Sequence, residues 1–357
     1  MTRTPGDRMT AGAPRPVPRC ELAPGYRVPQ IISGGWQLAR GHRQTAVDRG
    51  RAVRQLRRLA DAGFDTFDCG DIYLGVEELL GELLRLVPGI RVHTKFVPDL
   101  DELPRLGRRQ VERVVDRSLR RLGVERLDLV QFHWWDYEVP RYVATAVWLD
   151  ELRRAGKIRW LGATNFDVPR LAEILAAGVP LVAHQVQYSL LDRRPERGMV
   201  DLCREHGIRL LAYGTLAGGF LTRRYLARPD PRPPLANRSL VKYRLVIEDF
   251  GGWERFQELL GALAAIASRH GVSIANVAVR WTLERPGVAA AIVGALDAGH
   301  LEDNLRVFDL ELDDEDVERL APFVGAGPAG DVYAAERVRD GRHAAIMKYD
   351  LNRQAGA

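Results

Sequence analysis

Four polar side chains with complementary chemistry lie at or just after the ends of successive apolar runs: Asp68, Lys95 and His133 stand at such ends, and Tyr73 follows Asp68 by five residues. A tyrosine hydroxyl has an ordinary pKa of about 10, so it exchanges a proton near neutral pH only if a neighbouring cation favours the phenolate. Lys95, held by Asp68, would supply that cation, and His133 would complete a set of donors that orients a carbonyl oxygen. These residue types therefore predict proton transfer to or from an oxygen atom.

Lys95 is the most informative of the four residues. The chain has 52 Lys and Arg residues, of which only four are lysines. An arginine would serve in an ordinary ion pair, whereas a proton-transfer partner needs the compact, tunable ammonium group. Taken singly, each residue also has a structural explanation, such as a helix cap for Asp68 or a packed aromatic for Tyr73. Their occurrence at consecutive strand ends favours the functional interpretation.

Short apolar runs rich in β-branched residues alternate with amphipathic helical patterns along most of the chain. Strands are predicted at 31–34, 64–68, 92–96, 127–133, 159–164, 181–186, 209–212 and 289–293. Helices are predicted at about 45–62, 75–86, 107–122, 140–155, 167–177, 196–206, 253–270 and 299–306. This alternation predicts an α/β TIM (β/α)8 barrel, whose active site lies at the carboxyl ends of the strands.

A doubly wound open sheet is the competing architecture, but no break in the series indicates a reversal of strand order. One match to GxGxxG occurs, at Gly325, Gly327 and Gly330. It follows a predicted helix rather than a strand and lies too near the end of the chain for a βαβ unit. We therefore interpret it as a connector and not as a dinucleotide-binding fingerprint.

The predicted domain organisation is a flexible N-terminal segment over 1–25, a barrel over 26–324, and a C-terminal tail or mouth-covering segment over 325–357. Two stretches, 222–250 and 325–357, have no regular pattern. Long irregular loops in a compact domain are usually functional, so we expect both to lie near the mouth of the barrel.

Composition excludes several classes of protein. With 46% hydrophobic residues and a net charge of +5, the chain is not disordered as its main state.

The sequence has no run of 18 apolar residues and no apolar signal segment near its start, so we expect a cytoplasmic protein without membrane contact. Its three cysteines form no CxxC pair, so neither disulfides nor a metal site is expected. Arginine-rich stretches have helical spacing and few aromatics, which argues against nucleic-acid binding.

The chain resembles the aldo/keto reductase family over roughly residues 28–323. The matching stretches are GFDTFDCGDIYLGVEELLG (63–81), HTKF (93–96), RSLRRLGVERLDLVQFHWWD (117–136), GKIRWLGATNFD (156–167), HQVQYSLLDR (184–193), LLAYGTLAGGFL (210–221), GVSIANVAVRW (271–281) and IVGALDAGHLEDN (292–304). All of them occur in the order of the family, which makes the resemblance specific.

The resemblance implies hydride transfer between NAD(P)H and an aldehyde or ketone, with Tyr73 as general acid/base, activated by Lys95 and Asp68, and His133 orienting the carbonyl. The partner would be a small carbonyl or alcohol, and the protein a monomer or small homo-oligomer. The cofactor-binding residues implied by the matching are Gly35, Trp36, Asn165, Gln185, Tyr213, Leu216, Gly218, Gly219, Leu221, Gly294, Asp303 and Asn304.

The match is weaker at the adenosine end of the cofactor. Many family members carry Lys or Arg after the last strand, where these residues neutralise the 2′-phosphate of NADP. Here that segment begins Gly294, Ala295, Leu296 and Asp297, so the usual basic clamp is not evident. NADP(H) and NAD(H) therefore both remain open, as does an arginine supplied by another loop.

The substrate pocket is expected to have an apolar wall made by Trp36, Trp134 and Trp135, which lie beside the proposed catalytic residues. In the C-terminal segment, Arg337 and its basic neighbours could meet an anionic substrate, but we predict a solvated tail.

Two other functions use the same residues. One is a non-catalytic, cofactor-binding regulatory subunit, resembling the barrel subunits of potassium channels. The other is a lyase or epimerase that recycles the cofactor within each turnover. A hydrolase is disfavoured because the sequence has no GxSxG, HExxH or P-loop motif.

Overall fold

The computed structural model describes residues 16–42, 47–295 and 298–354. Eight parallel strands form a closed barrel in the order β10-β3-β4-β5-β6-β7-β8-β9. The strands are β3 (Ile31–Gly34), β4 (Thr66–Asp68), β5 (Arg91–Phe96), β6 (Leu127–Phe132), β7 (Ile158–Thr164), β8 (Leu181–Gln187), β9 (Arg209–Tyr213) and β10 (Val288–Gly294). The predicted TIM barrel is confirmed.

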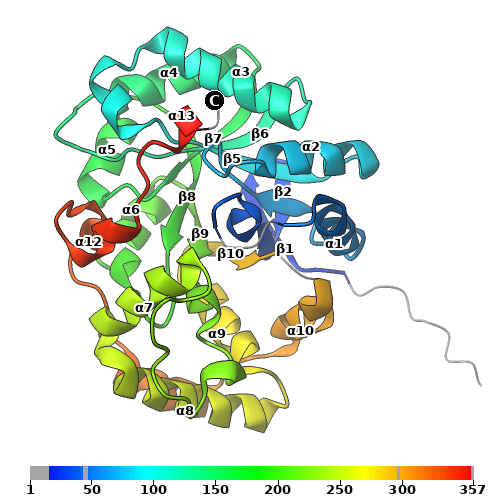
Figure 1. Ribbon diagram of the computed structural model, residues 1–357, viewed down its shortest axis with the longest axis vertical. Coiled ribbons are helices and arrows are strands. Elements are labelled where there is room, and N and C mark those ends of the chain that lie inside the picture. The colour runs from blue at the N-terminus through cyan, green and yellow to red at the C-terminus, as the bar shows by residue number, and fades with distance from the viewer. Residues whose placement is uncertain (1–15, 43–46, 296–297, 355–357) are drawn as a thin grey trace, which may run out of the picture.

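Seven barrel helices follow the predicted pattern: α1 (Arg49–Asp61), α2 (Val76–Leu86), α3 (Arg108–Leu122), α4 (Tyr142–Arg154), α5 (Val168–Ala176), α6 (Met199–Glu205) and α10 (Leu301–Arg306). The barrel helix α9 (Ile274–Leu283) was not predicted, because the helix predicted at 253–270 is the preceding one, α8 (Gly252–His270). The barrel helices surround the strands (Figure 1). Several begin at side chains that cap free backbone N–H groups, as Asp48 does for Arg51 at 2.9 Å and Asp167 for Arg170 at 3.0 Å. Their apolar stripes pack on the barrel, so the strands are buried on both faces.

A short hairpin precedes the barrel, formed by β1 (Arg19–Ala23) and β2 (Tyr26–Pro29). Leu22, Tyr26 and Val28 pack against barrel residues such as Leu129 in a separate apolar cluster. The flexible segment expected over 1–25 is therefore wrong for β1, because this strand buries apolar side chains. Residues 1–15 lie outside the described part of the chain.

The stretch 222–250, predicted to be irregular, contains the helix α7 (Arg238–Phe250). Asn237 caps this helix by accepting a hydrogen bond from the N–H of Leu240 at 3.0 Å. Gly251, with φ of 122°, ends α7 before α8 (Gly252–His270) begins. The arginines and prolines upstream of Asn237 obscure the helical pattern, which is why the sequence prediction missed α7.

After the barrel come α11 (Asp314–Leu320), α12 (Ala334–Arg337) and α13 (Leu351–Gln354). Figure 1 shows this C-terminal segment, in red, passing from α12 beside α6 to α13. At α13 the Asn352 side chain donates to the Val97 carbonyl at 2.5 Å. The prediction of a solvated tail is wrong for Arg337, which is half-buried and donates to Val332 O at 3.0 Å, and for His343, which is buried.

Within the described ranges, none of the helices taken singly has the length and apolar composition needed to span a membrane. The joined pair α8 and α9, bent by 95°, passes that test by length and composition alone.

Candidate active site

The centre of the site is a buried contact between the ends of β4 and β5. Lys95 Nζ lies 2.6 Å from Asp68 Oδ2 and donates to the Cys69 carbonyl at 2.7 Å. It also lies 5.0 Å from the centre of the Tyr73 ring, which follows β4 on the connection to α2. The chain therefore brings together the cation, the carboxylate and the phenol that the sequence singled out.

Two glutamines fix the other oxygen of Asp68. Gln131 Nε2 and Gln185 Nε2 donate to Asp68 Oδ1 at 2.9 and 2.6 Å, and Gln185 also donates to Gln131 Oε1 at 2.9 Å. Gln185 was predicted as a cofactor ligand, whereas Gln131 was missed. A polar residue inside the apolar run LDLVQF of β6 was the available signal, because alternation along the strand turns it into the barrel.

The ionisation of this centre follows from burial and from the close ion pair. Although burial alone would lower the pKa of Lys95, the Asp68 carboxylate raises it above its ordinary value. Burial raises the pKa of Tyr73, and the charge of Lys95 opposes that rise without reversing it. Lys95 is thus a permanent cation beside a protonated phenol.

His133 has a defined tautomer. Its Nδ1 lies 3.2 Å from the Thr164 carbonyl, which can only accept, so Nδ1 carries the proton. Burial lowers the pKa of His133 to about 4, so the ring is neutral and Nε2 is an acceptor. Nε2 is buried without a hydrogen-bond partner among the described residues. His133 therefore differs from the donor that the sequence analysis expected.

A cavity of about 810 Å³ opens above these residues, a volume typical of small-molecule and cofactor sites. Its lining includes the four proposed catalytic residues. It also includes most of the predicted cofactor residues: Trp36, Asn165, Gln185, Tyr213, Leu216, Gly218, Gly219, Gly294, Asp303 and Asn304. Here Tyr213 donates to Asn165 Oδ1 at 2.9 Å.

Three predicted residues do not line this cavity. Trp134 is buried in the apolar core and donates to the carbonyls of Asp136 and Val139 at 2.8 and 3.0 Å. Leu221 is buried in the apolar core. Gly35 is buried, and a Cβ atom added there would stand 2.9 Å from the Asp68 carbonyl oxygen. The substrate assignment of Trp134 is therefore corrected, whereas Trp135 does line the cavity. Residues 296 and 297 lie outside the described part of the chain.

The turn after β9 requires glycine. Gly214 and Gly218 have φ of 77° and 66°, and a Cβ atom would stand 2.5 and 2.7 Å from the Tyr243 ring or hydroxyl. Gly214 and Gly218 also line the cavity, so at these two positions backbone atoms face it without a side chain. Such a surface suits a bulky polar ligand.

Helix α7 contributes cavity residues that the sequence analysis missed. Arg238, Ser239, Lys242 and Tyr243 all line it. Lys242 Nζ stands 4.7 Å from the centre of the Tyr213 ring, and burial lowers the pKa of Lys242 to about 8. The rarity of lysine in this chain was the signal that could have pointed to Lys242.

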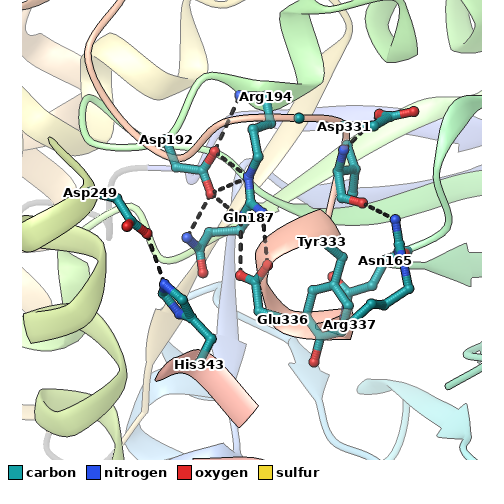
Figure 2. Close-up of polar contacts among 12 residues, drawn as sticks. Asn165, Gln187, Asp192, Arg194, Asp249, Asp331, Tyr333, Glu336, Arg337 and His343 are labelled. Atoms are coloured by element: carbon teal, nitrogen blue, oxygen red, sulfur yellow. Dashed lines mark hydrogen bonds and ion pairs between the residues drawn. The ribbon is translucent and has the colours of Figure 1, made fainter. Parts of the chain in front are cut away.

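The C-terminal segment closes one side of the cavity. Tyr333 lies against the His133 ring, with centroids 5.5 Å apart. Figure 2 shows how this segment is held: Arg194 lies between Asp192 and Glu336, and Arg337 reaches the Asn165 carbonyl. The Arg194 contacts measure 2.6 Å to Asp192 Oδ2 and 2.7 Å to Glu336 Oε2, with all three side chains buried.

Comparisons with known proteins agree with this geometry. The model of the aldo/keto reductase family matches residues 30–324. The aldo-keto reductase YhdN of Bacillus subtilis is 27% identical over 337 residues, which cover 88% of this chain and 97% of that protein. Flagellar radial spoke protein 5 of Chlamydomonas reinhardtii is 34% identical over 179 residues, 45% of this chain but only 34% of that protein.

Among solved structures, glycerol dehydrogenase from Gluconobacter oxydans superposes with a TM-score of 0.71 at 25% identity, covering 84% of this chain and 92% of that one. Because the family model spans most of the barrel, the similarity concerns the whole domain and not one motif. The chain belongs to the aldo/keto reductase family, and thereby to the NAD(P)-dependent oxidoreductases.

Proposed function

We propose that this protein reduces an aldehyde or ketone to an alcohol, with Tyr73 as the general acid and, in the reverse direction, the general base. The observation that carries the proposal is the position of Lys95, whose Nζ lies 2.6 Å from Asp68 and 5.0 Å from the Tyr73 ring inside the cavity. A phenol can release its proton there because the neighbouring ammonium stabilises the phenolate.

The nicotinamide cofactor supplies the hydride when it is bound. Tyr73 delivers its proton to the carbonyl oxygen as charge develops there, and Lys95 offsets the negative charge left on the phenolate. Asp68 positions Lys95 and is itself held by Gln131 and Gln185. His133 Nε2 accepts the hydrogen of the hydroxyl group that forms, because Nδ1 already carries the ring proton.

The cofactor would lie along the glycine-containing turn after β9, with its nicotinamide beside Tyr213 and its adenosine near Asn304. The described part of the loop after β10 offers His300 as its basic side chain toward the cavity. A phosphate on the ribose would gain little from this loop, and we propose that NADH is used at least as well as NADPH.

The test is a panel of aldehydes and ketones incubated with the purified protein and NADH or NADPH, followed by cofactor absorbance and product analysis. We expect one alcohol formed per reduced cofactor consumed. Product without net cofactor consumption would instead indicate a closed redox cycle, as in an epimerase. Cofactor binding without any turnover would indicate a regulatory subunit.

A further inference from the structure

Two cations on one face of α7 point to a second recognition element in the cavity. Arg238 and Lys242 are four residues apart, a spacing that places both on the same side of a helix. Both line the cavity, and neither forms an ion pair with a carboxylate of the described residues. Other helical cations that are largely buried have such a partner, as Arg121 of α3 has in Glu77 at 3.2 Å.

Lys242 lies over the part of the cavity that the cofactor would fill. Its Nζ stands 4.7 Å from the ring centre of Tyr213 and 5.4 Å from that of Tyr243. Tyr243 in turn packs on Gly214 and Gly218, the turn that follows β9. A diphosphate running along this turn would therefore be the natural partner of Lys242.

Arg238 lies over a different part of the cavity. Its Nη2 donates to the Ile346 carbonyl at 2.9 Å, and its backbone N–H donates to the His42 carbonyl at 3.2 Å. His42 contacts Trp36, with ring centroids 4.7 Å apart. Next to Ile346, Met347 accepts a hydrogen bond from Tyr333, which contacts His133. Arg238 is thus fixed among the residues that surround the proton-transfer centre, and its charge acts on Tyr73.

The electrostatic surroundings leave Arg238 available to an anion. Among the described residues, two carboxylates line the cavity and both are engaged, Asp68 by Lys95 and Asp303 by the Ser273 hydroxyl at 2.9 Å. Two further cations, Arg40 and Lys348, stand exposed at the rim. Only one hydrogen bond of the Arg238 guanidinium is made within the described residues, by Nη2. Nε, Nη1 and the second hydrogen of Nη2 remain as donors, so Nη2 can still form a fork with Nε or with Nη1, the geometry that suits carboxylate or phosphate.

We propose that Arg238 binds an anionic group, carboxylate or phosphate, on the carbonyl substrate, so that the natural substrate is an acidic aldehyde or ketone. This inference rests on the proposed function, because it assigns the substrate class of the same site. Tyr73 donates to the carbonyl oxygen of the substrate, His133 Nε2 accepts from the hydroxyl group that forms, and Arg238 binds the charged group. Lys242 instead contacts the diphosphate of the cofactor.

The test compares matched substrate pairs in the wild type and in Arg238→Gln. One pair is succinic semialdehyde and butanal, and the other is glyceraldehyde 3-phosphate and glyceraldehyde, which separates carboxylate from phosphate. We expect the wild type to prefer the anionic member of at least one pair. Arg238→Gln should lower kcat/KM for that member by about 10- to 100-fold, the usual loss for a charge-assisted hydrogen bond, and leave the neutral member nearly unchanged. Glutamine keeps a donor for the Ile346 carbonyl, and Arg238→Lys should recover part of the loss.

Arg232→Gln is the matched control, since Arg232 is an exposed arginine of the loop that precedes α7 and should leave both substrates unaffected. The inference is overturned if the wild type does not distinguish the pair members, or if Arg238→Gln slows both equally. It is also overturned if Arg238→Gln weakens cofactor binding instead, which would assign Arg238 to the diphosphate.

Failure of the proposed function has a different signature. If the wild type reduces neither member of any pair, succinate is titrated into the protein–cofactor complex by calorimetry. Binding that disappears in Arg238→Gln would still support the anion site, and absence of binding in the wild type would refute it.

Discussion

At the scale of single residues, the two lysines Lys95 and Lys157 show how position decides role. Lys95 is buried at the carboxyl end of β5 beside Asp68, whereas Lys157 precedes β7 at the other end of the barrel and pairs with Glu112 and Asp116 at 3.0 and 2.6 Å. Lys95→Met should lower kcat by about 100-fold or more, because it removes the cation that stabilises the phenolate. Lys157→Met should leave kcat unchanged. Equal losses in the two variants, measured under saturating cofactor, would contradict the assignment of the catalytic end of the barrel.

Lys242 gives a pH-dependent prediction. Because burial lowers the pKa of Lys242 to about 8, the amine is charged below pH 8 and neutral above it in the cofactor-free protein. Affinity for the reduced cofactor, measured by quenching of tryptophan fluorescence, should therefore weaken as the pH rises above 8. In Lys242→Met the affinity should be lower and flat across this range. A wild-type profile that does not change between pH 7 and 10 would exclude a charge–charge contact.

The convergence of the proposed catalytic residues could be predicted because strand ends meet at one face of a barrel, so residues far apart in the sequence lie together there. Gln131, Arg238 and Lys242 could not be predicted in the same way. The direction of Gln131 depends on strand register, and the two cations sit on a helix whose pattern is hidden behind an Arg- and Pro-rich loop. The tautomer of His133 depends on the position of the Thr164 carbonyl, which only the folded chain defines.

At the scale of elements, α2 packs directly against the backbone at the end of α3 at Gly81. A Cβ atom there would stand 2.5 Å from the Arg121 carbonyl oxygen and 2.9 Å from that of Leu122. Gly81→Ala should therefore destabilise the protein by about 1 to 3 kcal/mol, as overpacking does. Gly261→Ala in α8 is the matched control, because an added methyl there meets no atom within 4 Å and should stabilise the helix slightly. Thermal unfolding of the two variants checks the prediction, and equal Tm values would contradict it.

Strands and barrel helices were predictable because their apolar periodicity reports burial directly. The sequence prediction missed β1, β2 and α7, which lie outside the repeated strand–helix series, and also α9, which lies within it. β1 is short and pairs with β2 alone among the described strands, so its alternation of apolar and polar residues is weak. α7 is recognisable only from its cap at Asn237, since its residues face both the cavity and the core.

At the scale of the whole molecule, the C-terminal segment is tied to the barrel by the buried ion pair of Arg194 and Glu336. Burial alone would raise the pKa of Glu336. The neighbouring Arg194 lowers that pKa to about 2, below its ordinary value of 4.5. The folded state thus favours the ionised carboxyl, which contributes stability above pH 4.5 that is lost as the pH falls toward 2. This contact connects the last segment of the chain to the loop after β8, and thereby holds Tyr333 against His133.

Glu336→Gln should cost about 3 kcal/mol, because Arg194 keeps Asp192 but loses its second buried carboxylate. Hydrogen exchange should accelerate first in residues 331–343, ahead of the barrel strands. Glu315→Gln, at an exposed ion pair, should change neither quantity noticeably. Unchanged exchange in 331–343 would mean that apolar contacts alone hold the segment in place.

The most direct test of the central claim is single-turnover hydride transfer from bound reduced cofactor in the wild type and in Tyr73→Phe. Phenylalanine keeps the ring next to Lys95 but removes the hydroxyl, so the account predicts that the rate falls by about 100- to 10,000-fold while cofactor affinity stays nearly constant. A Tyr73→Phe variant that transfers hydride at the wild-type rate would show that Tyr73 is not the proton donor.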